Sequence, residues 1–300
     1  MKRKCDHDRL HELINDVKCR KIVVKGRNTQ TLCTYLNAIN DMVGLHDLKS
    51  FVCDVFFFYV ASLPCQEQFR NIAITGKPGC GKTDVSCKLA ALIQYLVFNS
   101  TKPVPVLCRA DLVGQVLGET AVKTSTALQQ HTKKCIFIDE VYSLGSTSSD
   151  KDIFSKECID TICAHLSENI TTCVMIVAGY HGETADCFFG QNEGLRRRFP
   201  FEFQLPPYTP DELLQILQLK LSNFTLQCTE EIRDHIVKCR RETPSFGAAE
   251  IMTFINCLML CHSAAVCYKK TKKTVILKET VAETISFKKP KSEAWLPMYT

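Results

Sequence analysis

One run of eight residues places glycines, a lysine and a hydroxyl at the spacing G-x-x-x-x-G-K-[ST], which is typical of a phosphate-binding loop. In such a loop the glycines let backbone N–H groups face a phosphate, and the following helix adds its positive end. Lys82 would place its charge on the β- and γ-phosphates of ATP, and the Thr83 hydroxyl would ligate Mg²⁺. The run consists of Gly76, Lys77, Pro78, Gly79, Cys80, Gly81, Lys82 and Thr83.

Two adjacent carboxylates, Asp139 and Glu140, follow an apolar run at residues 135–138. At the carboxyl end of a parallel strand, they would share a sheet edge with the phosphate loop. There Asp139 would hold Mg²⁺ through water, and Glu140 would orient the water that attacks ATP. The alternative is that the pair merely begins a loop. Together with the phosphate loop, the pair predicts a site that hydrolyses Mg-ATP.

Short apolar runs rich in β-branched residues alternate with helical patterns over the first two thirds of the chain. Such runs are expected of strands covered on both faces. Strand–helix alternation predicts an α/β fold, a parallel sheet of the P-loop NTPase type with helices on both faces. The predicted strands are residues 71–75, 104–107, 135–139, 173–178 and 201–205, and the clearest helices are 83–97 and 152–166.

After Tyr208 the pattern changes to helices alone. Thr209 is expected to be an N-cap, with Pro210 at the first helical position and Glu212 closing a capping box. Further helices are expected after Thr229 and over residues 247–267. The sequence therefore predicts a small all-helical domain behind the α/β domain, followed by a lysine-rich end with a short strand at 274–277.

Composition favours an ordinary soluble globular protein, because 45% of the 300 residues are hydrophobic and 23% are charged. No run of about 18 apolar residues is present, so no transmembrane helix and no membrane partner are expected. The positively charged N-terminus lacks an apolar segment behind it, so no secretory leader is expected. The net charge of +5 is modest, and a solvated tail explains its lysines better than nucleic acid does.

Eighteen cysteines are present, with no C-x-x-C pair. They are interpreted as free, reduced thiols packed as small apolar side chains, which predicts a reducing compartment, the cytoplasm or the nucleus. The alternative is a metal site at Cys257, Cys261, His262 and Cys267.

Several further segments resemble the CbbX/CfxQ branch of the AAA+ ATPases, which includes the red-type Rubisco activase and stage V sporulation protein K. Residues 42–49, with Val43 and Gly44, resemble the family segment that lies beside the adenine. The resemblance covers roughly residues 41–260. The other matching segments are residues 106–114, 118–124, 138–144 (IDEVYSL), 177–180, 193–200 and 208–213.

This resemblance implies a nucleotide-binding α/β domain at 41–207 and a helical AAA+ lid at 208–267, with an N-terminal extension at 1–40 and a tail at 268–300. Arg198 aligns with the arginine finger, and Arg196 is a second candidate. A finger acts on the nucleotide of a neighbouring subunit, so the family implies a ring of identical or related subunits, usually a hexamer. The ring would use ATP to remodel a protein partner that the sequence does not identify.

Two positions depart from the family pattern. Val116 stands where the first pore loop carries an aromatic residue, and Ala249 replaces the sensor 2 arginine. Tyr180 stands at the sensor 1 position, which is normally a polar side chain, but the Gly179-Tyr180 pair matches this branch. These departures motivate a second hypothesis, a nucleotide-gated interaction module with slow hydrolysis. A third hypothesis, a nucleic-acid motor, rests on the arginines at 196–198 and the lysine-rich tail.

Overall fold

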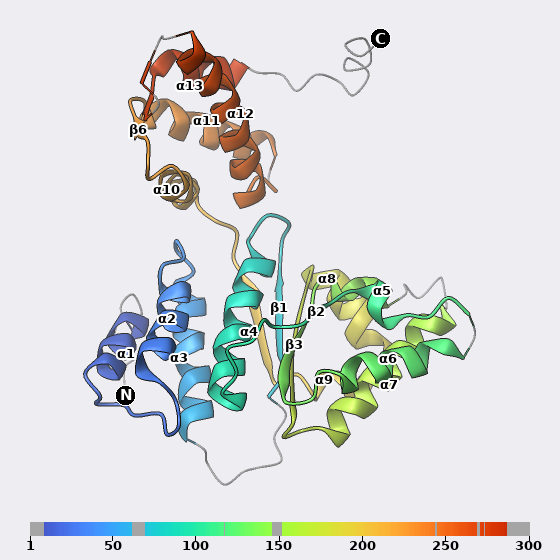
Figure 1. The fold of residues 1–300 in the computed structure, drawn as a ribbon. Coiled ribbons are helices and arrows are strands. Elements are labelled where there is room, and N and C mark those ends of the chain that lie inside the picture. Colours follow the sequence, from blue (N-terminus) through green and yellow to red (C-terminus); the bar gives the residue numbers. More distant parts are fainter. Residues whose placement is uncertain are drawn as a thin grey trace. The chain divides into compact units, whose positions relative to one another are not determined.

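A computed structural model describes residues 9–61, 70–116, 118–145, 152–243, 245–268, 271–272 and 274–286. The chain divides into two compact units, Met1–Pro207 and Tyr208–Thr300. Figure 1 shows a sheet flanked by helices in the first unit and helices in the second. The candidate phosphate loop and both predicted carboxylates belong to the first unit.

The first unit is built on a five-stranded sheet in the order β2-β3-β4-β1-β5. Every neighbouring pair of strands in this sheet is parallel. The predicted parallel α/β fold is confirmed. The strands are β1 Ile72–Gly76, β2 Val106–Leu107, β3 Lys134–Ile138, β4 Cys173–Gly179 and β5 Phe201–Leu205.

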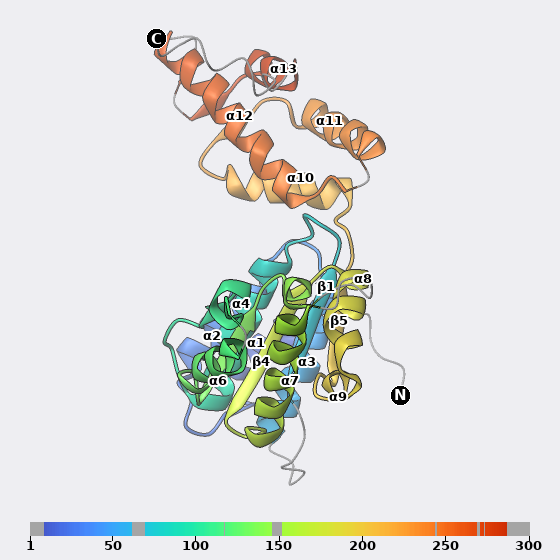
Figure 2. The ribbon, with the colours of Figure 1, turned by 90° about the vertical axis from the view of Figure 1, so that its right-hand side faces the viewer.

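Helices cover both faces of this sheet, with α2, α3 and α4 on one side and α6, α7 and α9 on the other (Figures 1 and 2). β1 and β4 are buried along their whole length, which explains their continuous apolar sequences. The flanking helices are α1 Arg9–Lys18, α2 Thr29–Asn40, α3 His46–Ala61, α4 Lys82–Phe98, α5 Arg109–Leu112, α6 Glu119–Gln129, α7 Ile153–Glu168, α8 His181–Glu183 and α9 Glu193–Arg196. The short helical turns are η2 Val141–Leu144, η3 Thr184–Phe188 and η4 Phe189–Gln191.

The first 40 residues are not a separate extension in their described part. α1 buries Leu10, Leu13, Ile14 and Val17, and it packs on α2 and α3. α2 in turn packs on α4, the helix that follows the phosphate loop. The expectation of an extension followed from a resemblance that begins near residue 41, whereas burial of these apolar faces joins both helices to the first unit.

The second unit contains the helices expected after Tyr208. Thr209 accepts a hydrogen bond from the Glu212 backbone N–H at 3.2 Å, and the Glu212 carboxylate accepts one from the Thr209 N–H at 2.6 Å. This reciprocal pair is the predicted capping box. The helices are α10 Pro210–Lys220, α11 Thr229–Glu242, α12 Ala248–Cys267 and α13 Lys278–Ser286.

The second unit continues beyond residue 267, where a lysine-rich tail was expected. The predicted strand is present as β7 Val275–Ile276, and it pairs in parallel with β6 Thr225–Leu226. α13 then packs on α12 and α11, with Val281 buried. This helix was not predicted, because its few apolar residues stand among lysines and threonines. Such a short amphipathic segment is stable only when it packs against its neighbours.

Of the described helices, only α12 is long and apolar enough to cross a membrane, by length and composition alone. Its Ile251, Ile255 and Leu258 are buried inside the second unit, whereas only 28% of its apolar window is buried in all. The sequence prediction of no such helix was too strict, because it counted uninterrupted runs rather than mean hydropathy.

Candidate active site

The phosphate loop joins β1 to α4 in a conformation that requires its glycines. Gly79 and Gly81 have φ angles of +72° and +84°, in the left-handed region that side chains disfavour. Gly81 is also the N-cap of α4 and supplies no side chain, so the first N–H groups of that helix are left to an anion. Cys80 is buried, which raises the pKa of its thiol and keeps it neutral.

Lys82 begins α4, and its ammonium lies within the loop. Its Nζ donates hydrogen bonds to the carbonyl oxygens of Gly76 at 3.1 Å and Lys77 at 2.9 Å. The same nitrogen lies 4.4 Å from the centre of the Tyr180 ring. The loop therefore holds a positive charge at the helix end where phosphates bind.

Thr83 and Asp139 meet although they are 56 residues apart in sequence. The Thr83 hydroxyl donates to the Asp139 carboxylate at 2.7 Å. This contact places the carboxyl end of β3 beside the first turn of α4. Hydroxyl and carboxylate oxygens are the hard donors that Mg²⁺ prefers, so this pair fits the predicted metal ligands.

Glu140 follows Asp139 in a strained backbone conformation, with a φ of +49°. Its N–H donates to the Asp139 carboxylate at 2.9 Å, and it forms the N-cap of η2. Its side chain is exposed. Positive φ is uncommon for glutamate, and such strain often occurs at active sites. The turn separates the two carboxylates, so that Asp139 faces Thr83 while Glu140 stays available to water.

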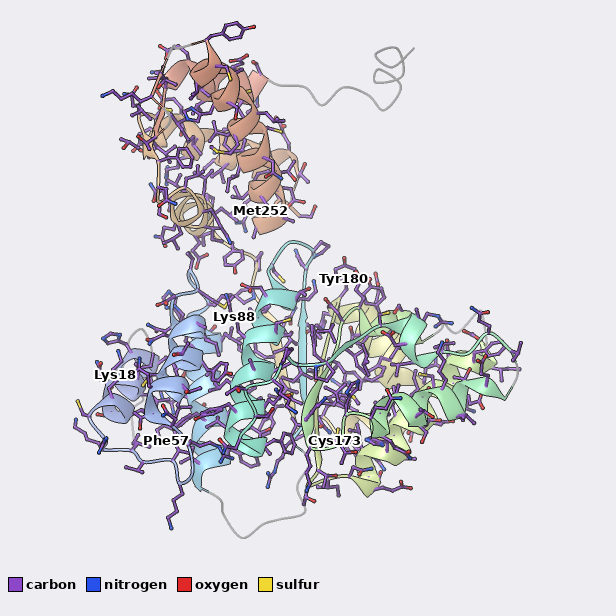
Figure 3. The ribbon with its side chains drawn as sticks, in the orientation of Figure 1. Lys18, Phe57, Lys88, Cys173, Tyr180 and Met252 are labelled. Atoms are coloured by element: carbon purple, nitrogen blue, oxygen red, sulfur yellow. The ribbon has the colours of Figure 1, made fainter. Side chains whose placement is uncertain are left out.

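Two tyrosines that the sequence did not bring together lie beside this centre. Tyr142 belongs to η2, and Tyr180 follows β4; their rings stack at 5.0 Å with planes 20° apart. Burial and then the charge of Glu140 raise the pKa of Tyr142 to about 12. Figure 3 shows Tyr180 at the end of the sheet opposite Cys173, the first residue of β4. Only the position of Tyr142 two residues after Glu140 could have singled it out.

Val43 and Gly44 lie in the loop between α2 and α3. Gly44 has a φ of +61°, and the Lys49 ammonium fastens this loop by donating to the Met42 carbonyl at 2.7 Å. In Figures 1 and 2 the loop lies at the same end of the first unit as the phosphate loop. This arrangement is compatible with the predicted adenine contact.

The three neighbouring arginines differ in their contacts. The Arg198 guanidinium donates to Ser167 Oγ at 2.6 and 2.8 Å and to the Gly194 carbonyl at 2.6 Å, so its own chain holds it. Arg196 is 62% exposed and pairs with Glu202 at 3.1 Å. Arg197 is exposed, and its backbone N–H donates to the Leu195 carbonyl as the C-cap of α9. An arginine finger that acts on a neighbouring subunit needs an exposed side chain. Arg196 and Arg197 meet this requirement better than Arg198, to which the sequence alignment assigned the finger.

These arginines lie far from the phosphate loop of their own chain. The Arg198 carbonyl accepts a hydrogen bond at 2.7 Å from Asn71, which immediately precedes β1. The phosphate loop begins at the other end of β1, which has five residues, or about 16 Å. An arginine of this segment is therefore separated from the phosphate loop of its own chain by the length of β1.

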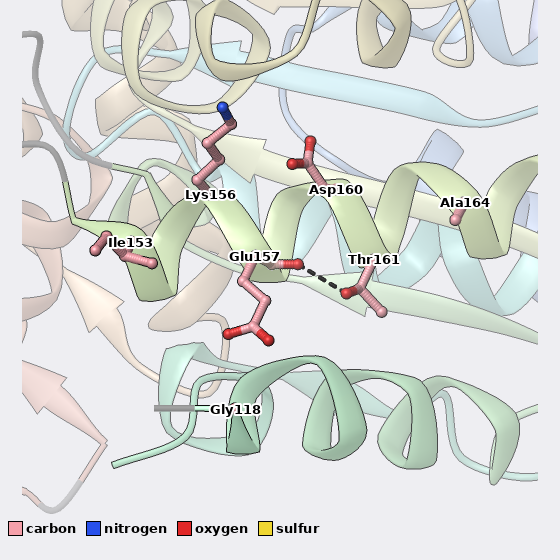
Figure 4. A pocket seen from close by; sticks show the side chains of 7 residues that line it. All are labelled: Gly118, Ile153, Lys156, Glu157, Asp160, Thr161 and Ala164. Atoms are coloured by element: carbon pink, nitrogen blue, oxygen red, sulfur yellow. Dashed lines mark hydrogen bonds between the residues drawn. The ribbon is translucent and has the colours of Figure 1, made fainter. Parts of the chain in front are cut away.

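The segment expected to form a first pore loop leads into a hollow between α6 and α7. The hollow has a volume of about 620 Å³, and Figure 4 shows Glu157 pointing toward α6. Val116 is 62% exposed, and it offers no aromatic ring. The lining residues of the hollow are Gly118, Ile153, Lys156, Glu157, Asp160, Thr161 and Ala164.

The expected sensor 2 position lies in the second unit. There Ala249 is exposed in the first turn of α12.

The family model described as "ATPase family associated with various cellular activities (AAA)" matches residues 72–206. A CfxQ homologue of Trieres chinensis is 31% identical over 238 residues, which are 74% of this chain and 79% of the relative. The chain belongs to the AAA ATPase family, in its CfxQ/CbbX group. Proteins of this family are ATP hydrolases, and ATP is therefore the nucleotide that the phosphate loop of this AAA chain takes.

Two further comparisons bear on the extent and the fold of this AAA chain. A putative cfxQ-like protein of Acanthamoeba polyphaga mimivirus is 33% identical over 235 residues, which are 77% of this chain but only 57% of that relative. The chain thus spans just over half the length of this relative. The structure of a Thermotoga maritima RuvB mutant aligns with 82% of this chain and 71% of its own, with a TM-score of 0.58 and 16% identity. That likeness concerns the fold alone.

Proposed function

We propose that this AAA chain binds Mg-ATP at the phosphate loop, hydrolyses it in an oligomeric ring and uses the cycle to remodel a protein partner. The hydrogen bond between Thr83 and Asp139 at 2.7 Å carries the proposal. It joins two motifs that are far apart in sequence, and it supports Thr83 and Asp139 as the metal ligands beside Lys82.

Each residue of the site has a separate role in this proposal. The loop glycines and Lys82 hold the phosphates, Thr83 and Asp139 hold Mg²⁺, and Glu140 orients the attacking water. Bound Mg²⁺ would neutralise charge on the phosphate oxygens. We assign the trans-acting finger to Arg196. Its ion pair with Glu202 is exposed and contributes little stability, so the arginine can leave it to contact a neighbouring subunit.

Two further features support parts of the proposal. The exposed Val116 offers a polypeptide partner an apolar contact, although without ring stacking. The free thiols at the described cysteines suit a reducing compartment, the cytoplasm or the nucleus. Subunits need not be identical, so related AAA+ chains could complete the ring. The family resemblance implies a ring of six subunits.

Phosphate release from Mg-ATP by the purified chain, over a range of protein concentrations, tests the enzyme. Turnover per subunit should rise with concentration, because an arginine must come from a neighbour. Lys82→Ala should abolish nucleotide binding, and Glu140→Gln should bind ATP with turnover at least 100-fold lower, as when a water-positioning group is lost. Unchanged phosphate release in both variants would refute the proposal.

A nucleotide-gated interaction module is the second candidate function. It is favoured by Ala249, which offers no charge to a phosphate at the position where the family carries arginine. In this case ATP would drive assembly while hydrolysis stayed slow. Light scattering with and without ATP, combined with turnover in the assembled state, separates the two functions. ATP-dependent assembly with negligible turnover would favour the module.

A further inference from the structure

The strongest unassigned feature near the site is the contact between the Lys82 ammonium and the face of Tyr180. The 4.4 Å separation is well inside the range at which an aromatic face attracts a cation. Two N–H groups of Lys82 already point to loop carbonyls. The ring face attracts the ammonium without accepting a hydrogen bond through a lone pair. The Tyr180 ring can therefore keep the Lys82 ammonium in place while the ammonium N–H groups change partners from loop carbonyl oxygens to phosphate oxygens.

The position of Tyr180 is set by contacts on both sides. The neighbouring His181 Nδ1 lies 3.2 Å from the hydroxyl of Thr75, the residue just before the phosphate loop. On the other side, Tyr142 stacks against the Tyr180 ring. Gly179 makes this stack possible, because a Cβ there would lie only 2.3 Å from Thr184 Oγ1 and 3.2 Å from Tyr142 Cδ1.

The electrostatics of the tyrosine pair suit this role. Burial and the nearby Glu140 raise the pKa of Tyr142 to about 12, so Tyr142 stays a neutral phenol at physiological pH. A neutral stacked ring adds no negative charge that would repel the ATP phosphates or compete with them for Lys82. Because Tyr142 lies in the turn that begins at Glu140, the same stack also connects the water-orienting segment to the phosphate-binding lysine.

We propose that Tyr180, supported by the stacked Tyr142, is a positioning residue that holds the Lys82 ammonium against the ATP phosphates through its ring face. The inference rests on the proposed function, because it assigns a role in the same ATP site. It explains how a tyrosine can serve at a position where the family usually uses a polar side chain. The ring acts on ATP through Lys82 and not by direct contact.

The test compares equilibrium binding of Mg-ATP and steady-state kinetics of the full chain with those of Tyr180→Phe and Tyr180→Leu. Tyr180→Leu removes the ring face and should weaken ATP binding roughly 3- to 30-fold, the range of a cation–π contact. Its KM should change more than its kcat, as expected when a contact holds both bound substrate and transition state. Tyr180→Phe keeps the face and should restore most of the affinity.

Two controls separate this role from simple packing. Tyr35→Leu removes another paired tyrosine, whose ring in α2 lies 5.4 Å from the Tyr95 ring in α4 with planes tilted by 43°, and it should leave ATP affinity unchanged. In urea unfolding, Tyr180→Leu should lower the midpoint less in a Lys82→Met background than in the wild type, because the two side chains contact each other. Additive shifts would contradict the contact.

The outcomes distinguish this inference from the proposed function. If the wild type binds and hydrolyses ATP while Tyr180→Leu binds it equally well, the inference is wrong and the proposed function stands. If Tyr180→Phe is as weak as Tyr180→Leu, the ring face is not the cause, and the inference is again overturned. If the wild type binds no ATP, both fail.

Discussion

Thr83 and Asp139 show how single side chains determine the chemistry of this site. A threonine at the start of a helix is ordinary, and so is an aspartate after a strand. Their hydrogen bond at 2.7 Å turns two ordinary residues into a pair of oxygen donors beside a lysine. The strained backbone of Glu140 belongs to the same scale, because one residue with positive φ separates the two carboxylates.

Ser86 in α4 allows a prediction about stability at the residue scale. Its side chain is 0% exposed, and its hydroxyl has no hydrogen-bond partner within the described residues. A buried unpaired hydroxyl is unfavourable, so Ser86→Ala should raise the free energy of unfolding by about 1 kcal/mol. Urea denaturation followed by circular dichroism measures this change.

Ser263→Ala is the matched control, because Ser263 is exposed and its hydroxyl donates to the Met259 carbonyl at 2.7 Å. It should change stability by less than about 0.5 kcal/mol. A clear loss of stability in Ser86→Ala would show that the hydroxyl is bonded in solution.

At the scale of elements, Arg109 joins three segments around the site. From α5 its guanidinium donates to the Ser143 carbonyl in η2 at 2.5 Å, and to Ser155 Oγ at 3.0 Å and the Asp152 carboxylate at 2.7 Å at the start of α7. Asp152 also caps α7 by accepting from the Phe154 N–H at 3.0 Å. The turn after Glu140 is therefore tied to the helix that lines the hollow.

Asp152 gives this junction a pH dependence. Hydrogen bonds from Ser155 and Arg109 hold the pKa of its carboxyl below the usual range. The Asp152 carboxylate therefore contributes its full stabilisation at pH values above its pKa in the unfolded chain, about 3.9. This contribution disappears as the pH falls through its lower pKa in the folded protein. Asp152→Asn should lower the free energy of unfolding by about 1 kcal/mol at pH 7, and the difference should shrink below pH 4.

Thermal unfolding of Asp152→Asn and the wild type between pH 3 and 7 checks this prediction. Asp54→Asn serves as the control, because the ion pair of Asp54 with Arg9 is more exposed and should contribute little at any pH. A difference for Asp152 that persists undiminished to pH 3 would contradict the role of its charge.

At the scale of the whole molecule, the two ends of the sheet have different tasks. The phosphate loop and both carboxylates lie at the carboxyl ends of β1 and β3, whereas the arginine segment lies at the amino end of β1. One chain cannot bring these ends together. A head-to-tail arrangement of subunits would do so at every interface, and such an arrangement forms a ring when the rotation between neighbours closes.

A mixing experiment tests this division of labour. Lys82→Ala and Arg196→Ala should each be nearly inactive alone, yet their mixture should regain activity, because one subunit supplies the phosphate loop and its neighbour supplies the arginine. Random mixing brings the intact residues together at about one interface in four, so recovery should approach about a quarter of wild-type turnover. Phosphate release at high protein concentration measures it.

Arg198→Ala is the informative partner variant in the same assay. Because Ser167 and Gly194 hold the Arg198 guanidinium within its own chain, its loss should lower stability, and mixing with Lys82→Ala should restore less activity. If the mixture of Lys82→Ala with Arg198→Ala regained full activity and the mixture with Arg196→Ala regained none, Arg198 would be the arginine finger.

The sequence by itself determined the features that are encoded by neighbouring residues. The phosphate loop, the Asp139–Glu140 pair and the Thr209 capping box are short motifs, because each depends on contacts within one turn or one strand–helix junction. The buried strands were also predictable, since a sheet covered on both faces demands unbroken apolar runs. The bounds of α4 and α7 differ from those expected by no more than two residues.

Only the tertiary structure decided which distant groups meet. It placed Thr83 against Asp139, Tyr180 over Lys82 and Arg198 against Ser167, all of which are contacts between separate elements. It likewise joined α1 and α13 to the two units, because their short apolar faces acquire meaning only when a partner covers them. Local pattern specifies an element, whereas the packing of elements in space specifies the site.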